Sequence, residues 1–113
     1  MDISHDDYQV QYDEAASTVR CSGSFRLHGA EYKPVLDLLG HAADAKPATL
    51  TLDVRELQFL NSSGINTLSK FILQVRKHNV SSVVVQGSTR YPWQEKSLKN
   101  LQRLLPALTL EIG

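Results

Sequence analysis

The segment Leu57-Gln58-Phe59-Leu60-Asn61-Ser62-Ser63-Gly64-Ile65 decides how this chain folds and functions. It follows a short apolar stretch, residues 49–54, that is typical of a β-strand, and it leads into a strongly amphipathic helix. Two hydroxyl side chains and a glycine therefore lie at a helix N-terminus. Free backbone N–H groups and the helix dipole favour an added negative charge there. The segment predicts a strand–turn–helix unit suited to carrying a phosphate on a serine that a partner recognises.

The remaining chain alternates between the two periodicities of strands and helices. Period-2 alternation and β-branched runs predict strands at about 8–12, 18–27, 49–54, 80–86 and 108–112. Helical spacing predicts helices at about 31–45, after Asn61, and at 94–104. Residues 15–17 are short enough to be the turn of a hairpin, and Gly23 marks a bulge in its second strand. The run at 80–86 is rich in β-branched valine, which is typical of a central strand buried on both faces.

The order of elements is therefore β-β-α-β-α-β-α-β. Strands that alternate with helices after an initial hairpin imply βαβ crossovers, so we expect an α/β fold with a mixed β-sheet and helices packed on it. A length of 113 residues fits one domain covering residues 1–113.

Composition narrows the class of protein. Hydrophobic residues make up 42% and charged residues 21%, as in an ordinary globular protein. The 12 basic and 12 acidic residues cancel, so we expect neither nucleic-acid binding nor membrane insertion. The single Cys21 rules out an internal disulfide and suits a reducing compartment. Without a signal peptide or an apolar run long enough to span a bilayer, the expected location is the cytoplasm.

The strand 49–54, the Leu57-x-Phe59-Leu60 segment and Asn61-Ser62-Ser63-Gly64-Ile65 at the start of a helix resemble the STAS domain family. That family takes its name from sulphate transporters and anti-sigma factor antagonists, and its order of elements matches nearly all of this chain. The resemblance implies a non-enzymatic switch, without cofactor or metal. In the anti-sigma factor antagonist branch, a partner that is both serine kinase and anti-sigma factor phosphorylates the second serine. The unphosphorylated form binds that partner, and a phosphatase resets the switch. By position, the acceptor here is Ser63, with Ser62 as the alternative.

One residue departs from the family pattern. Asn61 stands where the family usually has Asp; it keeps an oxygen that can cap the helix but lacks the negative charge. Two functions therefore stay open. The first is the phosphorylation switch, with a role in signal transduction and transcription regulation. The alternative is an accessory subunit of a transport or lipid-trafficking ABC complex, which binds without being phosphorylated.

The helix after Asn61 adds a candidate binding surface. Ile65, Leu68, Ile72 and Val75 form its apolar stripe. At 100° per residue from Ser63, an outward stripe contains Asn66, Lys70, Gln74 and Lys77, with Leu73 close by. We expect partner contacts at Asn61, Ser62, Ser63, Asn66, Lys70, Leu73 and Lys77. An exposed leucine among polar residues is a candidate anchor for a partner.

Other kinds of site find little support in the sequence. The serines lack the Gly-x-Ser-x-Gly elbow of a hydrolase, and no glycine-rich loop suits a nucleotide. The four histidines and one cysteine lack metal-ligand spacing. We expect Asp53 to be a helix cap or loop anchor, Cys21 to pack as a small apolar residue, and Trp93 to cover the end of the core.

Overall fold

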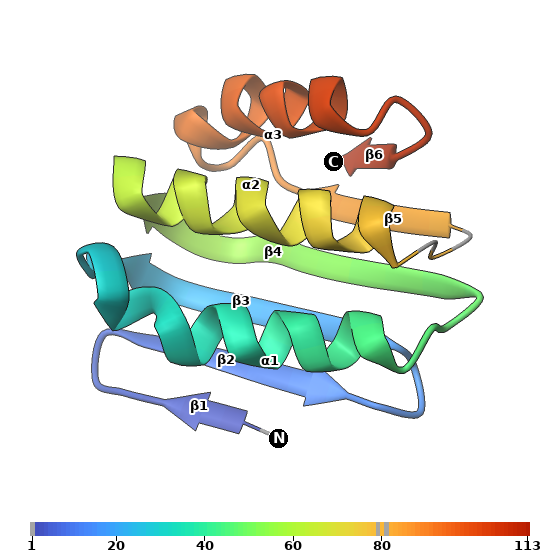
Figure 1. Cartoon of the computed structure of the whole chain (residues 1–113). Helices are drawn as coiled ribbons and strands as arrows, with labels where there is room; N and C mark the ends of the chain where they lie inside the picture. Colours follow the sequence, from blue (N-terminus) through green and yellow to red (C-terminus); the bar gives the residue numbers. More distant parts are fainter. Residues whose placement is uncertain (1, 79, 81) are drawn as a thin grey trace.

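A mixed β-sheet, covered by helices on one face, forms the protein in the computed structural model, which describes residues 2–78, 80 and 82–113 (Figure 1). Within these residues the sheet has six strands in the order β1-β2-β3-β4-β5-β6. The strands are β1 (Asp2–Ser4), β2 (Tyr8–Asp13), β3 (Thr18–Phe25), β4 (Thr49–Leu60), β5 (Ser82–Gly87) and β6 (Thr109–Ile112). The helices are the 3₁₀ helix η1 (Gly29–Tyr32), α1 (Lys33–Asp44), α2 (Ser62–Lys77) and α3 (Pro92–Leu104).

The pairing of neighbouring strands changes from antiparallel to parallel at β3. Strands β1, β2 and β3 pair antiparallel, whereas β3–β4, β4–β5 and β5–β6 pair parallel. The expected α/β class and mixed sheet are therefore confirmed. The structure adds the short strand β1 at the N-terminal edge and a 3₁₀ turn before α1, neither of which has a strong local pattern. Pro34 lies in the first turn of α1, where its missing N–H leaves no helical hydrogen bond unmade.

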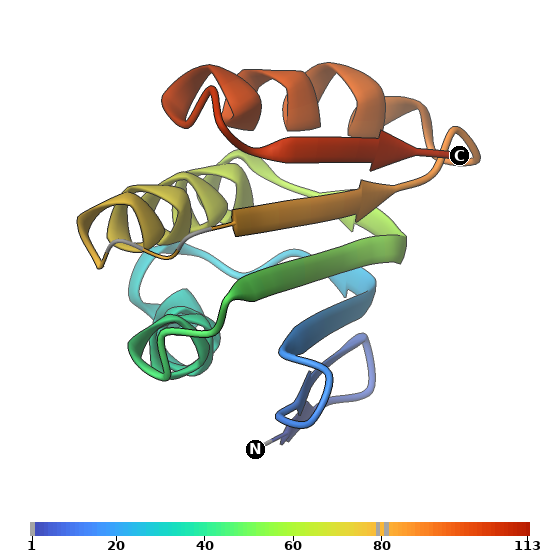
Figure 2. The same ribbon diagram turned by 90° about the vertical axis from the view of Figure 1, so that its right-hand side faces the viewer.

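Helices cover only one face of the sheet (Figure 2). This arrangement contradicts the expectation that the strand at 80–86 is buried on both faces. Along β5 burial alternates: Val83 and Val85 are buried, and Val84 between them is half-exposed. A β-branched run reports strand propensity, but the number of covered faces depends on where the helices pack.

The apolar core fills the space between the sheet and the helices. Its largest fully buried side chains include Phe25, Leu38, Leu52, Phe71 and Leu98, drawn from β3, α1, β4, α2 and α3. The predicted apolar stripe of α2 points into it, with Leu68, Ile72 and Val75 almost fully buried. Cys21 is also buried there, and burial raises the pKa of its thiol to about 12. The cysteine therefore packs as an apolar residue, as expected.

The bulge expected at Gly23 is present. The register between β3 and β4 shifts between Gly23 and Ser24, and Gly23 has φ of 87°, a left-handed conformation that glycine adopts without strain. A side chain at this position would also collide with the backbone carbonyl of Asp7.

Strand β4 is longer than expected, and α3 supports its second half. β4 pairs with β5 only as far as Asp53, so carbonyl groups beyond that point need other donors. The fully buried Gln94 supplies them: its Nε2 donates to the carbonyls of Val54 (2.7 Å) and Leu57 (3.0 Å). Trp93 Nε1 donates to the carbonyls of Leu57 and Gln58, so this side chain closes the end of the core, as predicted. The first turn of α3 thus holds the strand that leads to the serine motif.

Candidate functional site

The candidate site is the N-terminus of α2, where β4 delivers the two serines. Asn61 is the N-cap residue, with extended backbone angles, and its Oδ1 accepts a hydrogen bond from the Gly64 N–H at 2.9 Å. The helix begins at Ser62, and no acidic side chain lies in its first turn. The cap that the sequence predicted is therefore formed by an amide oxygen rather than by a charged carboxylate.

Asn61 also ties the site to two other segments. Its Nδ2 donates to the Leu27 carbonyl at 2.7 Å, and its Oδ1 accepts from the Tyr32 hydroxyl at 2.8 Å. Burial raises the pKa of Tyr32, an effect that a hydrogen bond from the Leu27 backbone partly opposes, so the hydroxyl stays protonated and can donate. The amide therefore uses both its donor and its acceptor ends. A carboxylate could keep the bonds to Gly64 and Tyr32, but it could not donate to Leu27.

The two serines differ in their surroundings. Ser62 is exposed, whereas Ser63 is half-buried and its Oγ accepts a hydrogen bond from the Gly29 N–H at 2.8 Å. Ser63 is thereby connected to the first residue of η1, thirty-four positions earlier in the chain. The sequence motif did not indicate this contact, because nothing in the local pattern places η1 beside the start of α2.

Gly64 allows the close packing beneath the serines. A Cβ atom at this position would collide with the Leu60 side chain and lie 2.9 Å from the Tyr32 hydroxyl. The glycine of the motif is thus required by space at the helix start, where α2 meets the end of β4 and η1. It does not adopt a left-handed conformation, since its φ is not positive.

The outward stripe of α2 lies where the sequence placed it except at Gln74, which is half-buried with its side-chain oxygen inaccessible. Asn66, Lys70, Leu73 and Lys77 are all exposed, and 47% of Leu73 is accessible. Together with Ser62 and Ser63 they make a continuous surface along the solvent side of α2, four turns in length.

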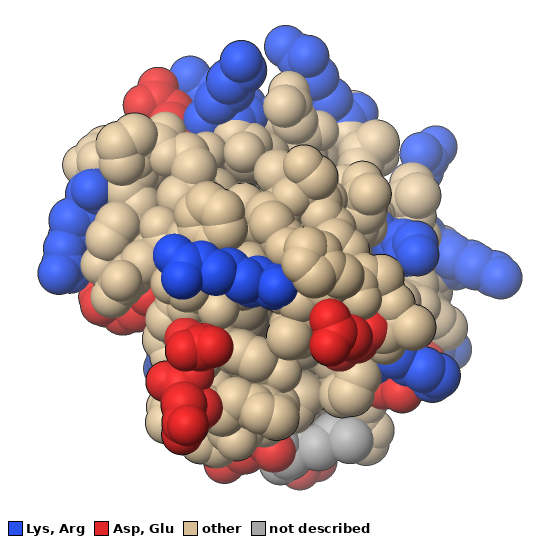
Figure 3. Space-filling model, turned by 90° about the vertical axis from the view of Figure 1, so that its left-hand side faces the viewer, with Lys and Arg blue, Asp and Glu red and all other residues tan. Residues whose placement is uncertain are grey.

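A cation–π contact lies at the same end of the molecule, outside the residues predicted to contact a partner. Phe59 near the end of β4 is 40% exposed, and the Arg26 guanidinium lies 5.1 Å from its ring centre. No local pattern indicates this contact, because Arg26 lies in the loop between β3 and η1. Figure 3 shows this end, where acidic and basic side chains are scattered around a largely uncharged surface.

Asp53 has a different role from the one expected. It lies within β4, not at a helix cap or in a loop, and its carboxylate pairs with Arg55 (2.9 Å) and Arg20 (3.6 Å). Burial raises the pKa of Asp53, but hydrogen bonds from Arg55 and the Arg20 charge outweigh it, so the pKa lies below its ordinary value. This ion-pair cluster occupies the sheet face that carries no helix.

Neither a metal site nor a membrane span emerges from the described parts of the chain. Across residues 2–78, 80 and 82–113, no group of three or more histidine, cysteine or acidic side chains could hold a metal ion. The helices in the same residues lack the length and hydropathy that crossing a bilayer requires.

A family model decides the classification. The model of the STAS domain matches residues 8–91, well over half of the chain. The chain belongs to the STAS domain family. The match includes β2 to β5 and the whole of α2, so the serine motif lies inside it. No curated protein sequence matches the chain significantly.

Solved structures share this fold at low sequence identity. SiaC of Pseudomonas aeruginosa is similar over 100% of this chain and 96% of its own, with a TM-score of 0.76 and 16% identity. A chain in the complex of the diguanylate cyclase SiaD with its activator SiaC, also from that organism, gives the same TM-score and identity, with coverage of 100% and 99%. An anti-sigma factor antagonist from Mycobacterium paratuberculosis has a TM-score of 0.69 and 18% identity, with coverage of 94% and 88%. The similarity to these proteins is one of fold.

Proposed function

We propose that this chain is a non-enzymatic protein-interaction switch in the cytoplasm, whose binding depends on the phosphorylation state of Ser63. The unphosphorylated form binds a regulatory protein of the serine kinase and anti-sigma type, and a phosphatase restores this form. One observation carries the proposal: the motif serines and the exposed stripe of α2 form one continuous surface. The similarity to SiaC, which activates a diguanylate cyclase, supports a protein partner within a signalling system.

Electrostatics explains why a phosphate would act on binding more than on the fold. Phosphorylation adds close to two negative charges, and the N–H groups and dipole of α2 stabilise negative charge at its start. The Gly29 N–H that now bonds Ser63 Oγ at 2.8 Å is a further donor to phosphate oxygens. A complementary partner surface must instead remove water from this charge, which costs several kcal/mol unless the partner pairs it.

Two measurements test the proposal. Phosphopeptide mass spectrometry of the protein from its native host should find phosphate on Ser63. The partner isolated with the wild-type chain should then bind Ser63→Asp at least tenfold more weakly in biolayer interferometry. Ser63→Ala should retain binding, and Ser4→Asp, which adds the same charge on exposed β1, serves as the matched control. Equal affinity of wild type and Ser63→Asp would contradict the switch.

A further control distinguishes phosphorylation of Ser63 from phosphorylation of Ser62. Ser62 is the more exposed of the two hydroxyls, so Ser62→Asp is measured in parallel. Phosphate found only on Ser62 would move the switch by one residue. A partner that proves to be an ABC transporter subunit, together with unmodified serines under several growth conditions, would favour the accessory-subunit function instead.

A further inference from the structure

The seam between α1 and α2 contains a shallow groove on the solvent side of the helix layer. Its walls are Leu36 of α1 and Leu73 of α2, with Lys70, Gln74 and Lys77 completing a volume of about 300 Å³. Leu36 is half-buried, and Leu73 is one of two large apolar side chains exposed among the residues described. The long alkyl stems of the lysines extend the apolar walls, while their ammonium groups reach solvent. We refer to these five residues as the α1–α2 groove.

Unused hydrogen-bonding capacity lies at the floor of this groove. Gln74 Oε1 is buried without a donor, and its side chain makes no hydrogen bond within the described part of the chain. The amide lies over Gly40 of α1, where a Cβ atom would be 3.4 Å from Oε1. Buried amide oxygens in folded proteins are almost always paired, so Gln74 is an exception at the seam between the two helices.

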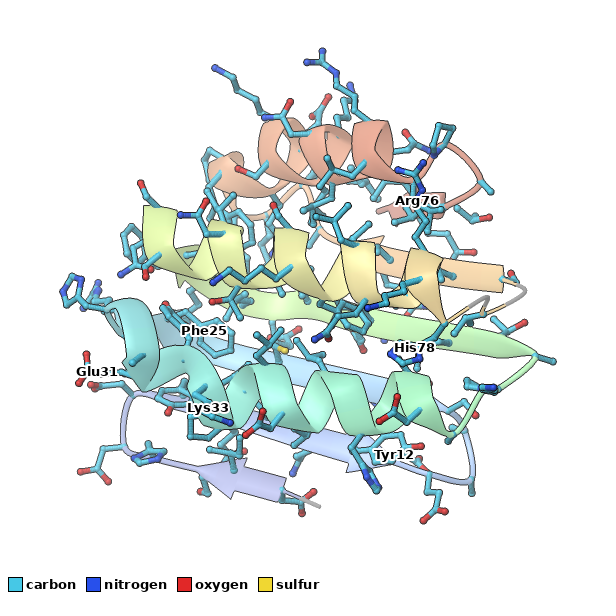
Figure 4. The ribbon with its side chains drawn as sticks, in the orientation of Figure 1. Tyr12, Phe25, Glu31, Lys33, Arg76 and His78 are labelled. Carbon is cyan, nitrogen blue, oxygen red and sulfur yellow. The ribbon has the colours of Figure 1, made fainter. Side chains whose placement is uncertain are left out.

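The charged residues that line the groove, Lys70 and Lys77, are both basic. The exposed Asp37 of α1, next to Leu36, is paired with Lys33 at 2.8 Å. Helix α2 contains three basic and no acidic side chains, and the three α-helices together carry seven basic against three acidic residues. Lys70 and Lys77 form no ion pair within the residues that the structure describes. Arg76 projects from α2 on the side of α3 and His78 lies toward α1, so the two lysines are the cations of the groove itself (Figure 4). The acidic residue at the α1 end of the seam, Asp44, is already paired with His78 at 3.3 Å.

We propose that the α1–α2 groove binds an amphipathic helix of a partner protein, with its apolar side chains between Leu36 and Leu73 and flanking Asp or Glu residues on Lys70 and Lys77. This inference rests on the proposed function and specifies the chemistry of its partner. The two lysines are seven residues apart, about 10 Å along the helix, which matches two turns of a docked helix. A phosphate on Ser63, a further two turns toward the start of α2, would repel such an acidic segment.

A synthetic peptide tests the groove without the natural partner. The probe is an 18-residue amphipathic helix with leucine at every third or fourth position and glutamate beside it. Its controls are the same helix with lysine for glutamate, and an acidic peptide of equal composition in scrambled order. Binding is measured by fluorescence anisotropy, and the contact surface by chemical-shift changes in ¹⁵N-labelled protein. We expect saturable binding of the acidic helix alone, with shifts at Leu36, Leu73 and Gln74.

Matched variants separate the groove from general attraction. The double variant Lys70→Glu/Lys77→Glu should weaken binding at least tenfold, and Leu73→Ala, at an exposed position that the fold does not need, at least threefold. Lys96→Glu/Arg103→Glu makes the same charge change at the same spacing on α3 and should change affinity less than twofold. Circular dichroism confirms that each variant is folded.

Three results would overturn the inference: no saturable binding of the acidic helix, equal loss in the α3 double variant, or a concentration-dependent dimer that Lys70→Glu/Lys77→Glu abolishes. The last would assign the groove to a second copy of the chain. Because the peptide assay uses unmodified Ser63, its failure is distinct from failure of the phosphorylation switch, which the Ser63→Asp comparison reports.

Discussion

Replacing Asn61 by the aspartate that is usual in the family should destabilise this protein, although it adds a favourable charge at a helix N-terminus. Asn61→Asp keeps an oxygen for the Gly64 N–H and the Tyr32 hydroxyl. It removes the Nδ2 donor that bonds the Leu27 carbonyl at 2.7 Å and leaves two oxygens facing each other. The change therefore exchanges a hydrogen bond for a repulsion at the junction of α2 with the loop after β3.

The magnitude follows from opposing contributions. Loss of a donor from a half-buried carbonyl costs about 1–3 kcal/mol. A negative charge at a helix N-terminus returns about 0.3–1 kcal/mol. The net loss of about 1.5 kcal/mol should lower the Tm by roughly 6 °C for a domain of this size.

Urea unfolding followed by the fluorescence of the single tryptophan, Trp93, measures the effect. Asn61→Ala, which removes all three hydrogen bonds, should be less stable than Asn61→Asp, and Tyr32→Phe should lose only the contribution of one hydroxyl. An Asn61→Asp variant as stable as the wild type, or more stable, would refute the reasoning. It would show that the asparagine is not held by its bond to Leu27.

Three further outcomes follow from the structure. Gly64→Ala should lower the free energy of unfolding by about 1–3 kcal/mol through overpacking. Gly40→Ala, inside α1 with room for a methyl group, should instead raise it by about 0.5–1 kcal/mol. Thermal melts of the two variants compare these effects. Gln94→Leu should cost at least about 2 kcal/mol in urea unfolding, because the Val54 carbonyl and the Ser88 N–H lose their partner and the Leu57 carbonyl keeps only the bond from Trp93. The pKa of Asp53 is lower in the folded chain than its ordinary 3.8, so its stabilisation is present above that pH and is lost as the pH falls through the folded value. The unfolding midpoint of Asp53→Asn should therefore change less between pH 5 and pH 2 than that of the wild type.

Local patterns predicted the elements and the start of the site well. The cap at Asn61, the buried stripe of α2 and the exposure of Leu73 all follow from one helical period, which needs no information beyond neighbouring residues. The expectations that failed concern context. A β-branched run cannot report how many faces of β5 are covered, and the residues around Asp53 do not show that β4 continues as far as Leu60.

The sequence by itself determined the α/β class, the position of the serines at a helix start and the outward stripe behind them. These properties depend on residues within one or two turns of each other, where propensity and capping act. Only the tertiary structure decided that Asn61 uses its amide nitrogen on Leu27, that Ser63 accepts from Gly29, and that Leu36 and Leu73 form a groove. These contacts join residues about thirty or more positions apart, so they depend on how the helices pack on the sheet rather than on any local pattern.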